Sequence, residues 1–270
     1  MPADPERDLG ILHRLGLAVE RVVRDSAGSP HRGDVVAMGA TGTPTEEVDR
    51  LAESAILAAL DAEGVDWNVV SEEIGSVARG GSRTLVVDPI DGTANAVRNL
   101  PFSSVSLALG VRDLAGVEVG LVRDLARGTT YWAVRGGGAW RDGRRIRTRP
   151  WSGRGELLLV NLGRAASARS AALVGRARRV RAIGCASLEL SLVAEGAADA
   201  YVFENADAGR NLRATDIAAA YRILLEAGGG ASDADGGSLE GFPLGVERRT
   251  TVLAWGDPAL GRTVWGAGSS

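Results

Sequence analysis

The chain of 270 residues, 45% of them hydrophobic, is long enough for one large domain or two modest ones. Its formal charge of −3 at pH 7 argues against nucleic acid or an anionic membrane as a partner. All 31 basic residues are arginine and only two residues are histidine, which excludes a lysine nucleophile and argues against a Ser-His-Asp triad or a histidine-bound zinc.

The first part of the chain is predicted to form two amphipathic helices. Apolar residues recur at helical spacing over residues 8–25 and again after Thr45, which we expect to cap the second helix. The glycine-rich residues 39–45 are either a mobile lid or a plain connector. Residues 1–7 lack a signal-peptide pattern, no stretch reaches the length of a membrane span, and the single cysteine, Cys185, suits a reducing compartment. We therefore expect a cytoplasmic protein.

Two short strands that end in acidic residues are the most informative part of the sequence. Residues 67–73 are predicted as a strand that ends in paired glutamates, Glu72 and Glu73. Residues 84–88 are predicted as a buried strand that stops beside Asp88, because Pro89 cannot donate to a sheet. Each pattern alone has an ordinary interpretation, a solvated strand end or an Asp-Gly turn.

The residues after the second strand add a phosphate site to the carboxylates. Gly92 permits a tight turn and Thr93 is a good cap for a short helix, whose N-terminus attracts phosphate oxygens. Asp88 and Asp91 carry the oxygen ligands that Mg²⁺ prefers. At the end of the strand and outside the core, they predict a site for a metal-bound phosphate.

The remaining elements change from strands alone to alternating strands and helices. A boundary is expected at residues 150–153, which would separate an α+β half, residues 1–150, from an α/β half, residues 151–270. Strands are expected at residues 104–111, 117–123, 129–134, 156–161, 180–183, 200–203 and 250–254, and helices at 165–176, 186–194 and 216–227.

Several blocks of the sequence occur in the order found in a known family. They are Glu72-Glu73, residues 87–95, Pro101-Phe102, and residues 184–188, 198–201, 215–219 and 226–229. Together they resemble the inositol monophosphatase family, and residues 39–45 and 212–216 resemble its archaeal-type members, which act on inositol-1-phosphate and fructose-1,6-bisphosphate. The resemblance implies the α/β fold of that family, a layered αβαβα sugar phosphatase, a homodimer, and Mg²⁺-dependent hydrolysis of a small phosphate ester.

The resemblance also implies the roles of individual residues. Glu72, Asp88 and the carbonyl group of Ile90 would hold one Mg²⁺, and Asp88, Asp91 and Asp216 a second. A water molecule positioned by Thr93 and Glu72 would be the nucleophile. Without the resemblance, Asp216 is a favourable residue for a helix N-terminus, and Cys185 is a packing residue. The implied substrate contacts are Asp91, Gly92, Thr93, Gly184, Ala186, Glu204, Arg213 and Asp216.

Two residues depart from the family pattern, one of them mildly: Thr215 stands where the family usually has tryptophan, and archaeal-type members tolerate threonine there. Thr41 replaces an acid in the glycine-rich loop, which affects a third metal held by the loop, and Glu46 is the candidate to compensate. The substrate stays open as well, with 3′-phosphoadenosine and histidinol phosphate as alternatives within the superfamily. A non-catalytic protein that binds sugar phosphates is the alternative from another class.

Overall fold

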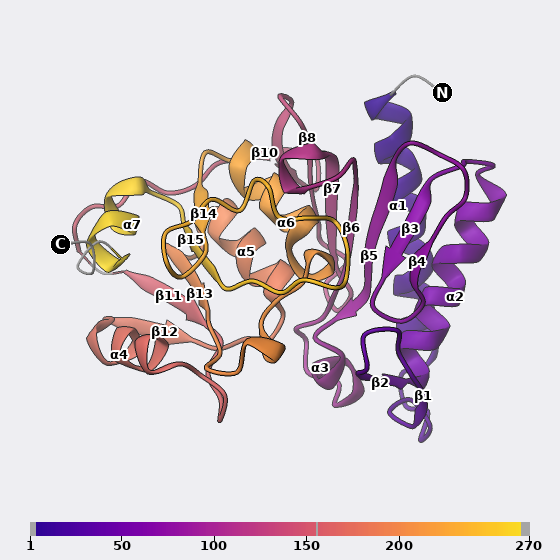
Figure 1. The fold of residues 1–270 in the computed structure, drawn as a ribbon, viewed down its shortest axis with the longest axis horizontal. Coiled ribbons are helices and arrows are strands. Elements are labelled where there is room, and N and C mark those ends of the chain that lie inside the picture. The colour runs from indigo at the N-terminus through magenta and orange to yellow at the C-terminus, as the bar shows by residue number, and fades with distance from the viewer. Residues whose placement is uncertain (1–3, 155, 266–270) are drawn as a thin grey trace.

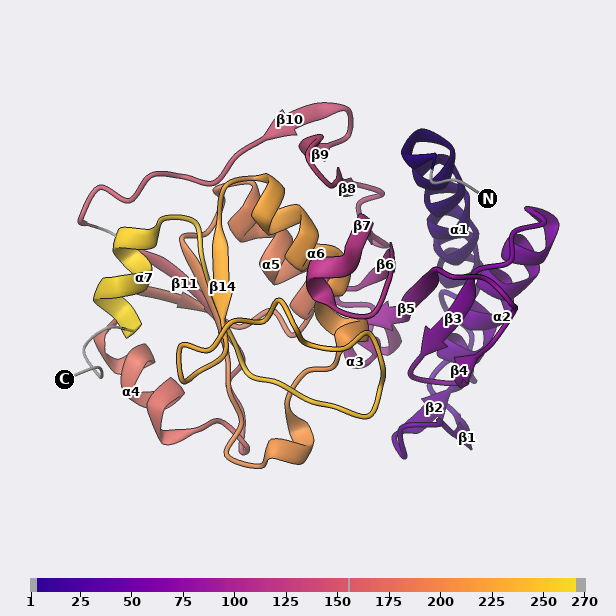
Figure 2. The ribbon, with the colours of Figure 1, turned by 45° about the horizontal axis from the view of Figure 1, so that its top comes forward.

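The protein folds into five layers in the order helices, sheet, helices, sheet, helices (Figure 1). The computed structural model describes residues 4–154 and 156–265. Residues 1–3, which belong to the segment where no signal peptide is predicted, lie outside the described residues. Helices α1 and α2 form one outer layer, α5 and α6 the central layer, and α4 and α7 the other outer layer (Figure 2). The helices are α1 (Pro5–Asp25), α2 (Glu47–Ala62), α3 (Thr93–Val97), α4 (Ala168–Arg176), α5 (Ala186–Ala194), α6 (Ala214–Glu226) and α7 (Pro258–Trp265).

The start of α2 differs from the prediction. Glu46, rather than Thr45, is the N-cap residue of α2. Thr45 lies in the short strand β2 (Pro44–Glu46), which pairs with β1 (Val35–Met38), and its hydroxyl group donates a hydrogen bond to Glu73. Thr45 therefore cannot cap the helix, because its side chain ties the hairpin to the acidic segment after β3.

Strand β5 (Thr84–Asp91) lies within an eight-stranded sheet with the order β10-β9-β8-β7-β6-β5-β3-β4. It runs parallel to β3 and antiparallel to β6. The other strands of this sheet are β3 (Asn68–Ser71), β4 (Gly75–Val77), β6 (Ser104–Gly110), β7 (Val117–Asp124), β8 (Thr130–Val134), β9 (Gly138–Arg141) and β10 (Arg144–Ile146).

The end of β5 also differs from the prediction. The strand does not stop beside Asp88 but continues through Pro89 to Asp91. Its pairing with β6 is irregular between Asp88 and Asp91, which places Pro89 at a bulge, where a residue without an N–H group is tolerated. Residues 85–91 are all buried, so the two aspartates do not lie outside the core as expected.

The second half of the chain builds a five-stranded sheet with the order β12-β11-β13-β15-β14. Strand β11 runs parallel to β12 and β13, and β15 runs antiparallel to β13 and β14. Helix α5 and strand β13 have the predicted bounds, whereas β14, α7, β4 and the β1–β2 hairpin were not predicted. The strands are β11 (Leu157–Val160), β12 (Arg179–Arg181), β13 (Ala200–Phe203), β14 (Gly230–Ser232) and β15 (Val252–Trp255).

The central helices share one hydrophobic core with both sheets. Val86 and Ala108 of the first sheet and Leu159 and Tyr201 of the second belong to the same buried cluster as α5 and α6. Because both halves contribute to this core, the boundary near residue 150 stays a prediction. None of the helices in the described residues is both long and apolar enough to cross a membrane.

Candidate active site

The end of β5 brings two buried aspartates to a tight turn. Asp88 and Asp91 are each 8% exposed. Gly92 follows with a φ angle of 83°, a left-handed conformation that glycine adopts without strain. A Cβ atom at this position would lie 2.8 Å from the carbonyl oxygen of Phe102 and 3.1 Å from that of Gly184. Only glycine therefore fits where the β5 turn meets the second half of the chain.

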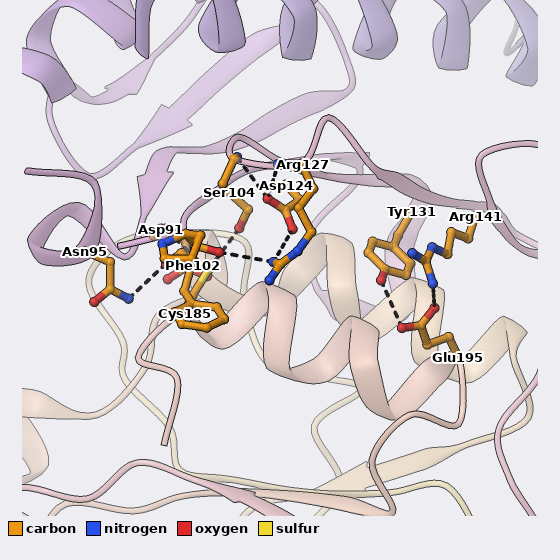
Figure 3. Close-up of polar contacts among 12 residues, drawn as sticks. Asp91, Asn95, Phe102, Ser104, Asp124, Arg127, Tyr131, Arg141, Cys185 and Glu195 are labelled. Atoms are coloured by element: carbon orange, nitrogen blue, oxygen red, sulfur yellow. Dashed lines mark hydrogen bonds and ion pairs between the residues drawn. The ribbon is translucent and has the colours of Figure 1, made fainter. Parts of the chain in front are cut away.

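Asp91 is bound by the first turn of α5, which comes from the second half of the chain (Figure 3). Its Oδ2 atom accepts hydrogen bonds from the Ser187 amide at 2.6 Å and from the Ser187 hydroxyl group at 2.7 Å. Its Oδ1 atom accepts one from the Ala186 amide at 3.2 Å, and the Cys185 thiol donates to Oδ2 at 3.3 Å. A carboxylate is favourable here because the first amides of a helix have no partner within the helix.

A side-chain amide makes a further link between the halves. Asn95 of α3 donates through Nδ2 to the carbonyl oxygens of Phe102 and Ile183, both at 2.9 Å, and lies 3.3 Å from that of Gly184. Gly184, a predicted substrate contact, has a φ angle of 76° and is exposed beside this link. The turn before α5 is thereby fixed against the turn after β5.

Glu72 and Asp216 come from opposite halves and are joined by Arg213. The Arg213 amide donates to Asp216 Oδ2 at 2.6 Å, and its guanidinium Nη1 lies 3.4 Å from Glu72 Oε1. The hydroxyl group of Thr215 donates to the same Glu72 oxygen at 2.9 Å. Arg213, predicted to contact substrate, is thus linked to two predicted metal ligands, and Asp216 also serves as the acidic residue of the first α6 turn.

Burial and neighbouring negative charges raise the pKa of Asp88 and Asp216. Burial is the main cause of the raised pKa of Asp88, and the negative charges of Asp91, Glu72, Asp216 and Asp49 add to it. Burial and then the charge of Glu72 raise the pKa of Asp216. Burial also raises the pKa of Asp91, although its hydrogen bonds to α5 oppose the change. These mutual effects show that the four predicted acidic ligands lie near one another, and that a cation would relieve their repulsion.

Asp49 is a site residue that the sequence analysis missed. Thr93 Oγ1 lies 3.2 Å from Asp49 Oδ1 and 2.9 Å from the carbonyl oxygen of Ile90, so its single proton is donated to one of the two at a time. Burial raises the pKa of Asp49 to about 8, and the charge of Glu73 is the next cause. The available signal was the helical position of Asp49, which shares the buried face of α2 with Glu53.

The donor set fits a hard cation, although the side chains do not surround a single point. Asp88, Asp216 and Glu72 each accept hydrogen bonds from described residues at only one carboxylate oxygen, so the other oxygen is left for a ligand. Across residues 4–154 and 156–265, no three Asp, Glu, His or Cys side chains are arranged to hold one ion. The reason is that Asp91 turns toward α5 and Asp216 toward the Arg213 amide. An all-oxygen donor set favours Mg²⁺ or a similar hard cation over zinc or copper.

Glu204 is not brought into this group. It lies just after β13, where it accepts a hydrogen bond from the Ser167 hydroxyl group at 2.7 Å and lies 3.6 Å from Arg169 Nε. These partners belong to the beginning of α4 rather than to the carboxylate site. The substrate contact of Glu204 stays a prediction that no contact in the structure supports.

Glu189 holds the turn before α5 and gives a pH-dependent prediction. It is 1% exposed and accepts a hydrogen bond from the Ile183 amide at 3.0 Å. Burial raises its pKa to about 8. An acid whose pKa is higher in the folded state stabilises the fold at low pH, and this contribution is lost as the pH rises toward 8.

We therefore expect Glu189→Gln to flatten the pH dependence of stability. Between pH 5 and pH 8 the free energy of unfolding of the unsubstituted protein should fall by on the order of 3 kcal/mol more than that of the variant. Urea unfolding at a series of pH values measures this difference. Parallel curves for the two proteins would show that Glu189 does not hold a proton in the folded state.

Comparisons with known proteins agree with this geometry. The sequence model of the inositol monophosphatase family matches residues 5–262. A fructose-1,6-bisphosphatase/inositol-1-monophosphatase of Methanothermobacter thermautotrophicus is 36% identical over 267 residues, which cover 93% of this chain and 92% of the relative. An inositol-1-monophosphatase of Aeropyrum pernix is 33% identical over 257 residues and 92% of each chain. The names of these relatives confirm the predicted class of phosphoric monoester hydrolases.

A solved structure supports the same fold. It is a hypothetical protein of Pyrococcus horikoshii, described as having similarities to inositol-1 monophosphatase. The two chains superpose with a TM-score of 0.84 at 25% identity, over 99% of this chain and 100% of the other. The predicted layered α/β architecture is confirmed.

Proposed function

Because the chain belongs to the inositol monophosphatase family, we propose that it hydrolyses phosphate monoesters of small sugars or cyclitols, with inositol-1-phosphate and fructose-1,6-bisphosphate as the first candidates. The observation that carries the proposal is the group of four carboxylates around Asp88, in which burial raises the pKa of Asp88, Asp91 and Asp216. Asp88 and Asp91 enter it from β5, Glu72 follows β3, and Asp216 lies at the start of α6. Such a group is costly to bury unless it serves to bind a cation.

The family is generally metal-dependent, and we propose Mg²⁺ as the metal of this protein. Glu72, Asp88 and the Ile90 carbonyl group would hold one ion, and Asp88, Asp91 and Asp216 another. Bound Mg²⁺ would supply positive charge to the phosphate group and would acidify a coordinated water molecule. The oxygen-only donor set supports this choice.

Protein groups would orient the attacking water and the phosphate. When Thr93 donates its proton to Asp49, its oxygen is free to accept a hydrogen bond from water, so the Thr93–Asp49 pair sets the direction of attack. The amides of Gly92 and Thr93 precede the first full turn of α3, where they lack helical partners and would donate to phosphate oxygens. Asp91 and Ala186 hold the two halves together beside this position.

The remaining expectations concern the setting of the enzyme. We propose a cytoplasmic homodimer that acts on small molecules rather than on nucleic acid or membranes. The single cysteine, Cys185, is free and buried, which agrees with a reducing compartment. The homodimer rests on the family resemblance.

Phosphate release from a substrate panel tests the proposal. We expect release from inositol-1-phosphate and fructose-1,6-bisphosphate with Mg²⁺, and less from 3′-phosphoadenosine and histidinol phosphate. If kcat/KM is higher for 3′-phosphoadenosine or histidinol phosphate, that compound becomes the proposed substrate. No release from any of the four would favour the non-catalytic binding protein.

The loop of residues 39–43 leads to a separate prediction about metal affinity. It lies against the acidic segment, because a Cβ atom on Gly39 would be 2.9 Å from Glu73 Oε2. Glu46 is close enough for its charge to raise the pKa of Asp49. We expect Thr41→Asp to lower the Mg²⁺ concentration at half-maximal rate, because it adds a charged oxygen ligand, and Glu46→Gln to raise it.

Magnesium titrations at saturating substrate measure both effects. Thr43→Asp is the matched control, because it adds the same charge two residues along the loop. If neither Thr41→Asp nor Glu46→Gln moves the midpoint, the loop does not contribute to the metal site.

A further inference from the structure

A cavity of about 560 Å³ lies next to the carboxylate site and is not used by the proposed reaction. Its walls come from both halves, with Thr41 and Ser76 on one side and Arg213, Glu247 and Arg249 on the other. The cavity adjoins the carboxylates directly, because Arg213 lines it and lies 3.4 Å from Glu72.

The cavity brings two arginine side chains together. Arg213 is 5% exposed, and its Nε and Nη2 atoms donate to the carbonyl oxygens of Val246 at 3.1 Å and Thr41 at 3.3 Å. Arg249 is partly buried and donates to the carbonyl oxygen of Asn211. Burial lowers the pKa of Arg249, and the positive charge of Arg213 is the next cause. Two guanidinium groups that oppose each other's charge in one cavity favour an anion between them.

The two carboxylates near the cavity do not cancel the positive charge of the two guanidinium groups. Glu72 pairs with Arg213, but Glu72 is also a proposed metal ligand, so a bound cation would draw on the same carboxylate. Glu247 lines the cavity and is exposed, so its charge is screened by water. Two guanidinium groups therefore face one paired carboxylate, so the cavity carries a surplus of positive charge without metal, and the surplus grows when Glu72 binds metal.

We propose that this cavity binds a phosphate group through Arg213 and Arg249. Guanidinium groups match phosphate oxygens with paired hydrogen bonds, and the half-buried position strengthens each of them. The phosphate is either the second phosphate of a bisphosphate substrate, which rests on the proposed function, or a free phosphate ion. Either phosphate would compete with Glu72 and with the Thr41 carbonyl oxygen for the Arg213 guanidinium group. Phosphate binding in the cavity would therefore affect both the metal site and the loop that contains Thr41.

Binding of inorganic phosphate tests the site without catalysis. Isothermal titration calorimetry in excess chelator keeps metal-dependent phosphate binding out of the measurement. We expect Arg249→Gln to weaken phosphate binding by about 10-fold or more, as for the loss of a charge-assisted hydrogen bond. Arg248→Gln is the matched control, because Arg248 is exposed and does not line the cavity. It should leave the affinity unchanged.

A second variant, with the opposite expected effect on phosphate affinity, tests the proposal if Arg249→Gln does not fold. Glu247→Gln removes the carboxylate of the cavity wall and should tighten phosphate binding. Equal affinities for the unsubstituted protein and both variants, or no phosphate binding by any of them, overturn the proposal.

Steady-state kinetics with two substrates distinguish a substrate phosphate from a free phosphate ion. If the cavity holds the second phosphate of a substrate, Arg249→Gln raises KM for fructose-1,6-bisphosphate and leaves KM for inositol-1-phosphate unchanged. If the ligand is a free ion, Arg249→Gln loses phosphate binding and keeps both KM values. The proposed function fails in a different way, because the unsubstituted protein would then hydrolyse neither substrate.

Discussion

Replacing Asp91 by asparagine is expected to lower kcat by at least about 100-fold, because the substitution removes a charged ligand from the site where phosphate charge must be offset. The structure indicates that Asp91→Asn also lowers the stability of the fold. Both carboxylate oxygens of Asp91 accept hydrogen bonds from α5, whereas asparagine has one acceptor oxygen. Its Nδ2 group would face the Ser187 amide, donor against donor, which costs about 1–3 kcal/mol. Steady-state kinetics and thermal unfolding of the same preparation measure both effects.

Ser187→Ala separates the two contributions of Asp91. It removes the hydroxyl group that donates to Asp91 but keeps the charge of the aspartate. We expect it to lower the melting temperature while kcat falls far less than in Asp91→Asn. If the two variants lose kcat in proportion to their loss of stability, Asp91 is a structural residue and the assigned metal role is wrong.

Removing divalent metal is expected to abolish hydrolysis completely. The described site offers four carboxylates whose charges oppose that of a phosphate group, and the two guanidinium groups beside it, Arg213 and Arg249, already bind Glu72 or backbone carbonyl groups, so we expect metal to be needed to offset the charge of the reacting phosphate. Excess chelator should stop phosphate release, and added Mg²⁺ should restore it. Mg²⁺ should also raise the melting temperature, since it binds the folded state and relieves the repulsion between buried carboxylates.

Two controls make the metal experiment specific. Chelator already saturated with Mg²⁺ should leave the rate unchanged, which excludes a direct effect of the chelator. Asp88→Asn should lose the stabilisation by Mg²⁺ as measured by thermal unfolding, independently of turnover. Full activity in excess free chelator would contradict the metal-dependent mechanism.

Local patterns predicted the fold because they coincide with buried elements. The apolar run before Asp88 is a central strand, and residues 186–194 form the central helix α5. In both cases one short segment contains the apolar residues that the element buries.

The errors arose where distant residues decide the local structure. Pro89 did not end β5, because a bulge opposite β6 accepts a residue without an amide hydrogen. Thr45 did not cap α2, because its hydroxyl group binds Glu73, 28 residues away. A single sequence does not indicate these pairings, since they depend on how β3 and the hairpin meet in space.

The sequence analysis named four carboxylates that lie together in the structure, whose role as metal ligands stays a prediction, and it missed the contacts that hold them. Glu72, Asp88, Asp91 and Asp216 lie near one another as the motif order implied. Their supports come from far away: Ser187 is 96 residues from Asp91, and most of what holds the turns is backbone amide and carbonyl groups. Such contacts leave little trace in residue type, so no pattern of side chains could have predicted them.

The links between the halves restrict how the molecule can move. Asp91 binds the start of α5, and Asn95 binds the carbonyl groups just before it, so the two turns meet through several hydrogen bonds at the centre of the site. A hinge motion that opened the halves would have to break these bonds together and expose a buried carboxylate. The β1–β2 hairpin takes no part in these bonds: its strand β1 is exposed along its whole length, and the hairpin is tied to the acidic segment by hydrogen bonds from the Ala40 amide and the Thr45 hydroxyl group to Glu73. In such a molecule turnover would be paced by a small flap on a rigid body rather than by the closing of two domains.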